Sequence, residues 1–252
     1  MNDEGLRGRV FLVTGSGRGL GRALACGAGA EKARVVVNTR RDERAAEAVA
    51  AEVQKAGGEA IAVRADVTDF EEARVLVERT LEKWGRIDVL VNTVGQFHWN
   101  PLVEMEPPEW RRIVATNLDS VFHMCRLVVP HMRERRFGRI VNLAAVGAAG
   151  TQGEPQMTAY GAAKAGVVAL SRALALEEAR CGITVNVVSP GLLKDETGDK
   201  VAAAADAMLA ERVPVGHAGD SADVVRAVLF FASPAADFVT GQVVEVAGGA
   251  RL

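Results

Sequence analysis

The sequence is poor in cysteine. Its 252 residues include three cysteines, Cys26, Cys125 and Cys181, which lie far apart and form no CxxC pair. An odd number of isolated cysteines argues against a disulfide framework and against a cysteine zinc site. The histidines do not cluster in the sequence either. We therefore expect no metal site, and a reducing compartment.

Long apolar runs and an excess of one charge are also absent. The longest uninterrupted apolar runs fall far short of a membrane span, and the first residues, MNDEGLRGR, lack the apolar segment of an export signal. The formal net charge is -2 and the charged fraction is 25%, which provides no global positive field for nucleic acid. We expect a cytoplasmic protein whose partners include neither nucleic acid nor a membrane.

Hydrophobic residues are abundant, at 49% of the chain, and they follow two alternating patterns. Short β-branched runs begin near residues 9, 34, 59, 87, 138 and 183, and a last one, VVEV, begins at 243. Between them lie segments with apolar residues every three to four positions, notably 42–57, 70–85 and Glu109 to about Arg135. Repeated β-α-β units predict an α/β protein with a doubly wound Rossmann-type fold in a single domain, residues 1–252. Its parallel sheet would have about seven strands, with helices on both faces.

One long irregular stretch lies at about 190–220. Its middle is rich in alanine and its flanks carry glycines. This is the composition of a segment that closes over a ligand, so we predict a substrate lid there.

The motif TGSGRGLG, residues 14–21, follows the first predicted strand and opens the first predicted helix. Glycines allow the backbone to approach a pyrophosphate closely, and a helix N-terminus offers it unpaired N–H groups. In a β-α-β series this turn predicts a dinucleotide site. The site would use Gly15, Ser16, Arg18, Gly19, Leu20 and Gly21.

The residues after the second predicted strand, VVVNTRRDER, bear on the choice of cofactor. An acidic residue there would bind the ribose hydroxyl of NAD, whereas a basic residue meets the additional phosphate of NADP. Position 38, where an acid would bind the ribose, is an asparagine. Arg40 and Arg41 follow it closely, and Arg18 supplies a further cation. The pattern favours NADP(H), with ordinary surface charge as the alternative interpretation.

Tyr160 is the single tyrosine of the chain, and Lys164 follows it four residues later. Positions i and i+4 share one face of a helix, and a nearby ammonium favours the phenolate. The pair therefore predicts a tyrosine that donates a proton during catalysis.

Further motifs occur in a set order: ADVTD at 65–69, NTVG at 92–95, Asn117, YGAAK at 160–164 and SPG at 189–191. With the glycine motif they resemble the short-chain dehydrogenase/reductase family over the whole chain, especially its 3-oxoacyl-carrier-protein reductase and pteridine-reductase-like branches. The resemblance implies that Tyr160 is the proton donor, that Lys164 lowers its pKa and binds the nicotinamide ribose, and that Asn117 holds a water in the proton path. It also implies cofactor contacts from Asp66, Val67, Asn92, Gly95, Pro190 and Gly191.

One family feature is missing. The family normally has a serine after its fifth strand, where this chain has Ala145, and Tyr160 lies two residues farther on than is common. Pteridine reductases have an aspartate at this place, and none occurs here. Loss of one such hydrogen-bond donor costs about 10² to 10³ in rate. We expect weakened activity, a substitute group, or a substrate that needs little polarisation, such as an imine or a protonated heterocycle.

The segment QFHWNP, residues 96–101, follows the fourth predicted strand at its carboxyl end, where ligands bind in open α/β sheets. Phe97, His98 and Trp99 would either line a substrate pocket with Ala145 or pack the loop. The C-terminal FVTGQVVEVAGGARL resembles the family's subunit-contact tail, which implies a homotetramer, with a dimer as the alternative.

The sequence thus predicts an NADPH-dependent reductase of a small molecule. A 3-oxoacyl thioester is the first substrate class and a pterin-like heterocycle the second. The rival hypothesis is a non-catalytic NADP(H)-binding sensor or partner subunit. Both hypotheses predict cofactor binding, and only the first predicts turnover that depends on Tyr160.

Overall fold

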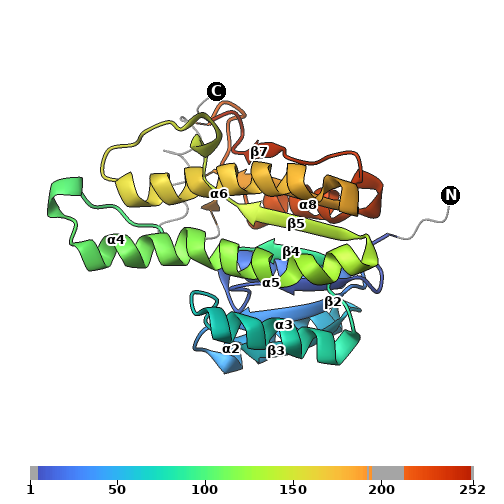
Figure 1. Cartoon of the computed structure of the whole chain (residues 1–252). Coiled ribbons are helices and arrows are strands. Elements are labelled where there is room, and N and C mark those ends of the chain that lie inside the picture. Colours follow the sequence, from blue (N-terminus) through green and yellow to red (C-terminus); the bar gives the residue numbers. More distant parts are fainter. Residues whose placement is uncertain (1–4, 192, 195–212, 251–252) are drawn as a thin grey trace.

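The computed structural model describes residues 5–191, 193–194 and 213–250. Seven parallel strands form one sheet in the order β3-β2-β1-β4-β5-β6-β7, which confirms the predicted fold class (Figure 1). Every predicted strand run is a strand. The strands are β1 (Val10–Val13), β2 (Arg34–Thr39), β3 (Glu59–Arg64), β4 (Val89–Asn92), β5 (Gly138–Leu143), β6 (Ile183–Pro190) and β7 (Val243–Val246).

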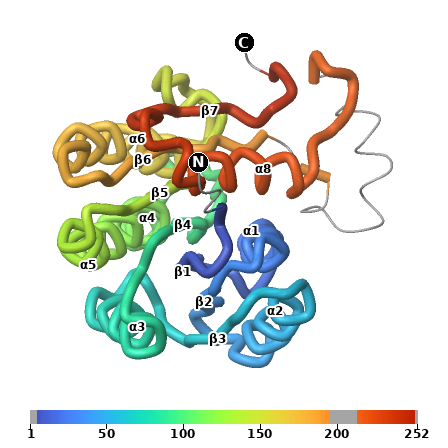
Figure 2. Tube along the Cα trace, turned by 90° about the vertical axis from the view of Figure 1, so that its right-hand side faces the viewer, coloured from blue at the N-terminus to red at the C-terminus, as the bar shows by residue number. Residues whose placement is uncertain are grey.

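Helices cover both faces of this sheet. Figure 2 shows α1, α2 and α8 on one face and α3, α5 and α6 on the other. The α-helices are α1 (Gly19–Ala30), α2 (Glu43–Lys55), α3 (Phe70–Trp84), α4 (Pro107–Val114), α5 (Ser120–Arg135), α6 (Thr158–Glu178) and α8 (Ser221–Ala232). Short 3-10 turns occur at Leu102–Glu104, Ala148–Gly150, Ala179–Cys181 and Pro234–Ala236.

The two layers follow from the alternation of side chains along each strand. Phe11 and Val13 pack in the core under α1 and α8, while Leu12 between them packs under α3 and α5. Successive side chains of a strand point to opposite faces, so a strand covered on both faces must be apolar throughout. This is why the runs read as continuous apolar segments.

Helix ends are set by local residues. The Asp42 side chain accepts a hydrogen bond from Ala45 N at the start of α2, and Asp69 accepts from two backbone N–H groups at the start of α3. Such caps satisfy backbone donors that have no partner within the helix. Gly85 ends α3 in the left-handed conformation that glycine adopts without strain.

The helix predicted from Glu109 to about Arg135 is not uniform. A π-helical turn, Ala115–Asp119, separates α4 from α5 and contains Asn117. The Asn117 side-chain amide donates to Ile113 O at 3.0 Å, so it competes with the backbone for a carbonyl of the preceding turn. Such π turns concentrate at functional sites, because the extra residue redirects a side chain.

Most of the predicted lid, residue 192 and residues 195–212, lies outside the described residues. The described residues on either side of it are joined, because Leu193 and Gly219 form a parallel bridge. Within the described ranges, no helix is both long and apolar enough to cross a membrane.

Candidate active site

The sequence motifs converge at one edge of the sheet. The strand order changes direction between β1 and β4, and ligands of open α/β sheets bind beyond the carboxyl ends of the strands at such a point. The glycine motif follows β1, Gly95 follows β4, Ala145 follows β5 and Gly191 follows β6. In Figure 1 the loop between β5 and α6 lies at the same side of the sheet as the start of α4.

The glycine motif has the geometry of a phosphate cradle. Gly15 and Gly19 have positive φ angles of +62° and +54°, and a Cβ on Gly21 would lie 2.6 Å from Gly15 O. Helix α1 begins here with no side-chain cap at Arg18 and no acidic residue in its first turn. A helix N-terminus of this kind presents donors and positive potential to an anion, so these residues fit a pyrophosphate.

Asn38 organises this cradle, a role that the sequence analysis missed. Its side-chain oxygen accepts from Gly15 N at 3.0 Å, and its amide donates to Val63 O and Ala65 O. Asn38 is fully buried, so it ties together the loops after β1, β2 and β3. A polar residue at the end of the apolar run VVVN was the available signal.

One predicted phosphate-binding arginine, Arg40, lies beside the predicted adenine site. Arg40 Nη1 is 3.7 Å from Asp66 Oδ2, and Asp66 also accepts from Thr68 N. The side chain of Arg40 is half exposed, and Arg18 and Arg41 are exposed. These cations can therefore meet an anionic group that approaches from solvent.

Asn92 points into the protein. Its amide donates to Asn142 Oδ1 at 2.8 Å, and Asn142 in turn donates to Ser171 Oγ at 2.9 Å. All three side chains are buried. The Asn92 side chain therefore braces β4, β5 and α6 against one another at the floor of the site.

Lys164 and Asn117 meet at Gly95. A Cβ on Gly95 would lie 2.7 Å from Asn117 Oδ1 and 3.2 Å from Lys164 Nζ, so this position needs glycine. Lys164 Nζ donates to Leu143 O at 2.9 Å and lies 5.7 Å from the centre of the Tyr160 ring. Burial of Lys164 lowers the pKa of its ammonium to about 8, because the charged form loses its hydration. Asn117 Oδ1 is buried and accepts no hydrogen bond from the described residues.

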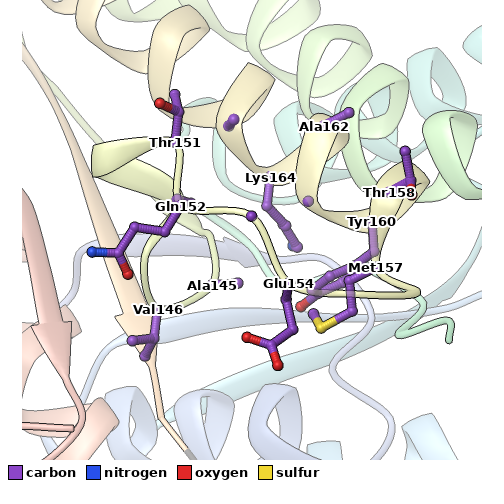
Figure 3. Close-up of a pocket in the computed structure, with 14 residues that line it drawn as sticks. Ala145, Val146, Thr151, Gln152, Glu154, Met157, Thr158, Tyr160, Ala162 and Lys164 are labelled. Carbon is purple, nitrogen blue, oxygen red and sulfur yellow. The ribbon is translucent and has the colours of Figure 1, made fainter. Parts of the chain in front are cut away.

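Tyr160, Lys164 and Ala145 line one pocket with a volume of about 340 Å³ (Figure 3). The methyl group of Ala145 offers no hydrogen bond. Most of the wall is small or apolar. The remaining lining residues are Val146, Ala148, Thr151, Gln152, Gly153, Glu154, Met157, Thr158, Gly161, Ala162 and Ala165.

Comparison with known proteins decides the family. A family model described as Enoyl-(Acyl carrier protein) reductase matches residues 15–251. The 3-oxoacyl-(acyl-carrier-protein) reductase FabG of Haemophilus influenzae is 40% identical over 247 residues, which cover 98% of this chain and 100% of that protein. The chain belongs to the short-chain dehydrogenase/reductase family.

Two further members of this family support the assignment. The 3-oxoacyl-(acyl-carrier-protein) reductase of a Synechocystis species is 38% identical over 245 residues, 97% of each chain. The crystal structure of a dehydrogenase/reductase from Sinorhizobium meliloti 1021 superposes with a TM-score of 0.88 at 32% identity, over 98% of this chain and 97% of that chain. The protein is therefore a short-chain oxidoreductase, of a family that typically binds a nicotinamide cofactor.

The segment after β4 contacts Tyr160. The ring of Phe97 meets Tyr160 edge-on at 5.2 Å, and Trp99 packs on Phe97. His98 Nε2 pairs instead with a carboxylate oxygen of Glu109 in α4. Of the three residues predicted to line the pocket, Phe97 contacts Tyr160, Trp99 packs against Phe97, and His98 anchors the segment to α4.

Glu154 is the second residue that the sequence analysis missed. It lies in the loop between β5 and α6 and lines the pocket with Tyr160. Nothing in the local pattern marks it, because a glutamate in a loop before a helix is usually solvent-exposed. Among the described residues, no group of three or more His, Cys, Asp or Glu lies where it could hold a metal ion.

Proposed function

We propose that this protein is an NADP(H)-dependent oxidoreductase that reduces a polar double bond of a small molecule, with Tyr160 as proton donor. The observation that carries the proposal is the position of Lys164, which lines one pocket with Tyr160 and lies next to Asn117 at Gly95.

NADPH, when bound, supplies a hydride to the substrate. The residues from Gly15 to Gly21, with Ser16 and Leu20 among them, would hold the pyrophosphate, and Arg18, Arg40 and Arg41 the additional phosphate. Asp66 and Val67 would flank the adenine. Lys164 would hold the nicotinamide ribose, and Gly95, Pro190 and Gly191 would border the nicotinamide. The positive φ angles of the cradle, its uncapped helix and the half-exposed Arg40 support this placement.

The protein's own residues would manage the proton. The Tyr160 hydroxyl donates its proton to the substrate atom that gains electron density, and the nearby Lys164 ammonium stabilises the phenolate that remains. Asn117 Oδ1, an acceptor with no donor among the described residues, is suited to hold a water beside Lys164. This water would connect the buried lysine to solvent.

The substrate class has two candidates. A 3-oxoacyl thioester comes first, because curated relatives at 40% and 38% identity are reductases of that substrate. A pterin-like or imine-type heterocycle comes second, and Ala145 favours it. Without a hydroxyl at Ala145 the pocket polarises a neutral carbonyl less well.

The surface supports a homotetramer, which we propose as the assembly in the cytoplasm. Phe122 and Leu176 are 51% and 82% exposed on the α5 and α6 face, and Phe230 and Phe238 are 56% and 100% exposed on and after α8. A tetramer with perpendicular twofold axes needs two separate apolar faces as subunit interfaces, whereas a dimer needs one. The three free cysteines fit a reducing compartment. Mass measured by light scattering distinguishes tetramer from dimer.

The decisive test follows NADPH oxidation with 3-oxoacyl thioesters, dihydropterins, quinones and cyclic imines. Tyr160→Phe keeps the ring that Phe97 contacts and removes only the hydroxyl. We expect it to reduce turnover by about 10² or more while NADPH affinity stays within about twofold. Turnover of the Phe variant at the parental rate would refute the mechanism. Tight NADPH binding with no turnover of any class would favour the non-catalytic alternative.

A further inference from the structure

The loop between β5 and α6 contains a built turn that carries Glu154. Met157 N donates to Glu154 O at 3.1 Å, which closes a four-residue turn. Pro155 occupies the second position of this turn. Gln156 occupies the third position and has a φ of +66°. These are the features of a type II turn, in which proline fixes one dihedral and the third residue must be left-handed. Glu154 therefore begins a turn with a defined conformation.

A second contact fixes the turn against the rim of the pocket. Asn100 N donates to Gln156 O at 2.8 Å, which joins the turn to the segment that places Phe97 on Tyr160. In Figure 3 the side chains of Glu154, Met157 and Tyr160 point to the same side of the loop, whereas Gln152 points away. The turn thus places a half-buried carboxylate at the pocket wall.

The charges of this wall are uneven. Among the described residues that line the pocket, Glu154 is the single acid and Lys164 the single cation. Lys164 is buried at the back, where its Nζ is bound to Leu143 O. An ionised carboxylate only accepts hydrogen bonds, so Glu154 attracts a cation or a donor and repels an anion. Near an apolar wall this preference is stronger than in bulk water.

We propose that Glu154 determines specificity, and that the substrate carries a protonated nitrogen at or next to its reacting carbon. An iminium ion or a protonated heterocycle has this chemistry. The inference rests on the proposed function for the reaction and adds the charge of the substrate. Ala145 supports it independently, because a protonated C=N group is already polarised and needs no hydroxyl donor. The hydroxyl missing at Ala145 and the carboxylate present at Glu154 then have one explanation.

Binding, measured without turnover, tests this inference first. The protein is titrated calorimetrically with tetrahydroisoquinoline, an amine protonated at neutral pH, in the presence of NADPH. It is titrated with tetralone, a neutral ketone of similar shape, in the presence of NADP⁺, so that neither pair can exchange a hydride. Glu154→Gln keeps the shape of the side chain and removes its charge. We expect this variant to bind the amine about tenfold to a hundredfold more weakly and tetralone with unchanged affinity. Glu154→Asp, which keeps the charge on a shorter side chain, should lie in between.

A matched control separates a local contact from a general charge effect. Glu82 lies on α3 with its side chain 66% exposed, so Glu82→Gln removes the same charge from a remote surface. It should leave the affinity for the amine unchanged. Thermal unfolding of each variant confirms that the fold is kept. Equal affinity of parent and Glu154→Gln for the amine overturns the inference, as does parental protein that prefers tetralone.

Turnover then distinguishes this inference from the proposed function. Dihydroisoquinoline and its N-methyl iminium salt should be reduced in a reaction that depends on Glu154. Hydride addition to an iminium ion gives a neutral amine and takes up no proton, so the N-methyl salt should not need the Tyr160 hydroxyl, whereas a neutral 3-oxoacyl thioester should. If thioesters are reduced in a reaction that depends on Tyr160, and Glu154→Gln does not change the affinity for the amine, the proposed function stands and the inference fails. If the amine binds through Glu154 and no probe is reduced, the inference about the ligand stands and the proposed reaction fails.

Discussion

Replacing Lys164 by methionine should stabilise the protein and remove its activity. Lys164 is 5% exposed, and burial lowers its pKa from 10.5 to about 8. This difference corresponds to about 3 kcal/mol of unfavourable free energy for the charged form at neutral pH. Methionine has a similar length and carries no charge. Loss of the hydrogen bond from Nζ to Leu143 O costs about 1 kcal/mol, so we expect a net gain of about 2 kcal/mol at pH 7.

The difference in unfolding free energy between the two proteins should depend on pH. The unfolded chain binds the lysine proton more tightly than the folded protein does, so between a pH of about 8 and 10.5 the unfolded state holds more protons. The parental protein therefore becomes more stable relative to Lys164→Met as the pH rises through this window. The advantage of the variant is complete below a pH of about 8 and is lost above 10.5.

Urea unfolding without cofactor, at one fixed protein concentration, measures this difference at pH 7 and at about pH 10. Lys83→Met, at an exposed position near the end of α3, is the control and should change stability by less than about 0.5 kcal/mol at both values. A Lys164→Met variant that is less stable than the parent by the same margin at both pH values would refute the reasoning. It would mean that burial of this cation costs nothing.

Substitutions at three more places test the site. Ala145→Ser restores a hydroxyl beside Tyr160 and should raise kcat for a 3-oxoacyl thioester about tenfold or more, but hardly for an iminium substrate; equal effects on both would contradict this. Replacing Arg40 and Arg41 by alanine should weaken NADPH binding about tenfold in a fluorescence titration and leave NADH binding unchanged, so a parallel loss of both would be the contrary result. Glu245 accepts from Gly147 N at 2.7 Å, and Glu245→Ala should lower the unfolding free energy by about 1 to 2 kcal/mol and raise KM. Glu245→Gln, which keeps an acceptor, should show less than half of that loss.

The amino-acid sequence determined the fold because its signals are local. Apolar runs of strand length, the capping residues Asp42 and Asp69, and Gly85 at a helix end each act within a few residues. The parallel order of the sheet follows, since helices of this length must cross over between successive strands. The glycine motif and the spacing of Tyr160 and Lys164 are equally local, so each could be predicted from a single short segment of the chain.

Tertiary structure alone decided how individual polar side chains are used. Asn38 joins three loops, and the Asn92 side chain faces into the protein, because partners distant in sequence satisfy their amides. Burial of Lys164, which sets its pKa, depends on how α6 packs on the sheet. Glu154 reaches the pocket because a turn is held by a backbone contact some fifty residues away in the chain, at Asn100. Periodicity fixes which face of an element is buried, whereas these contacts depend on which elements the folded chain brings together.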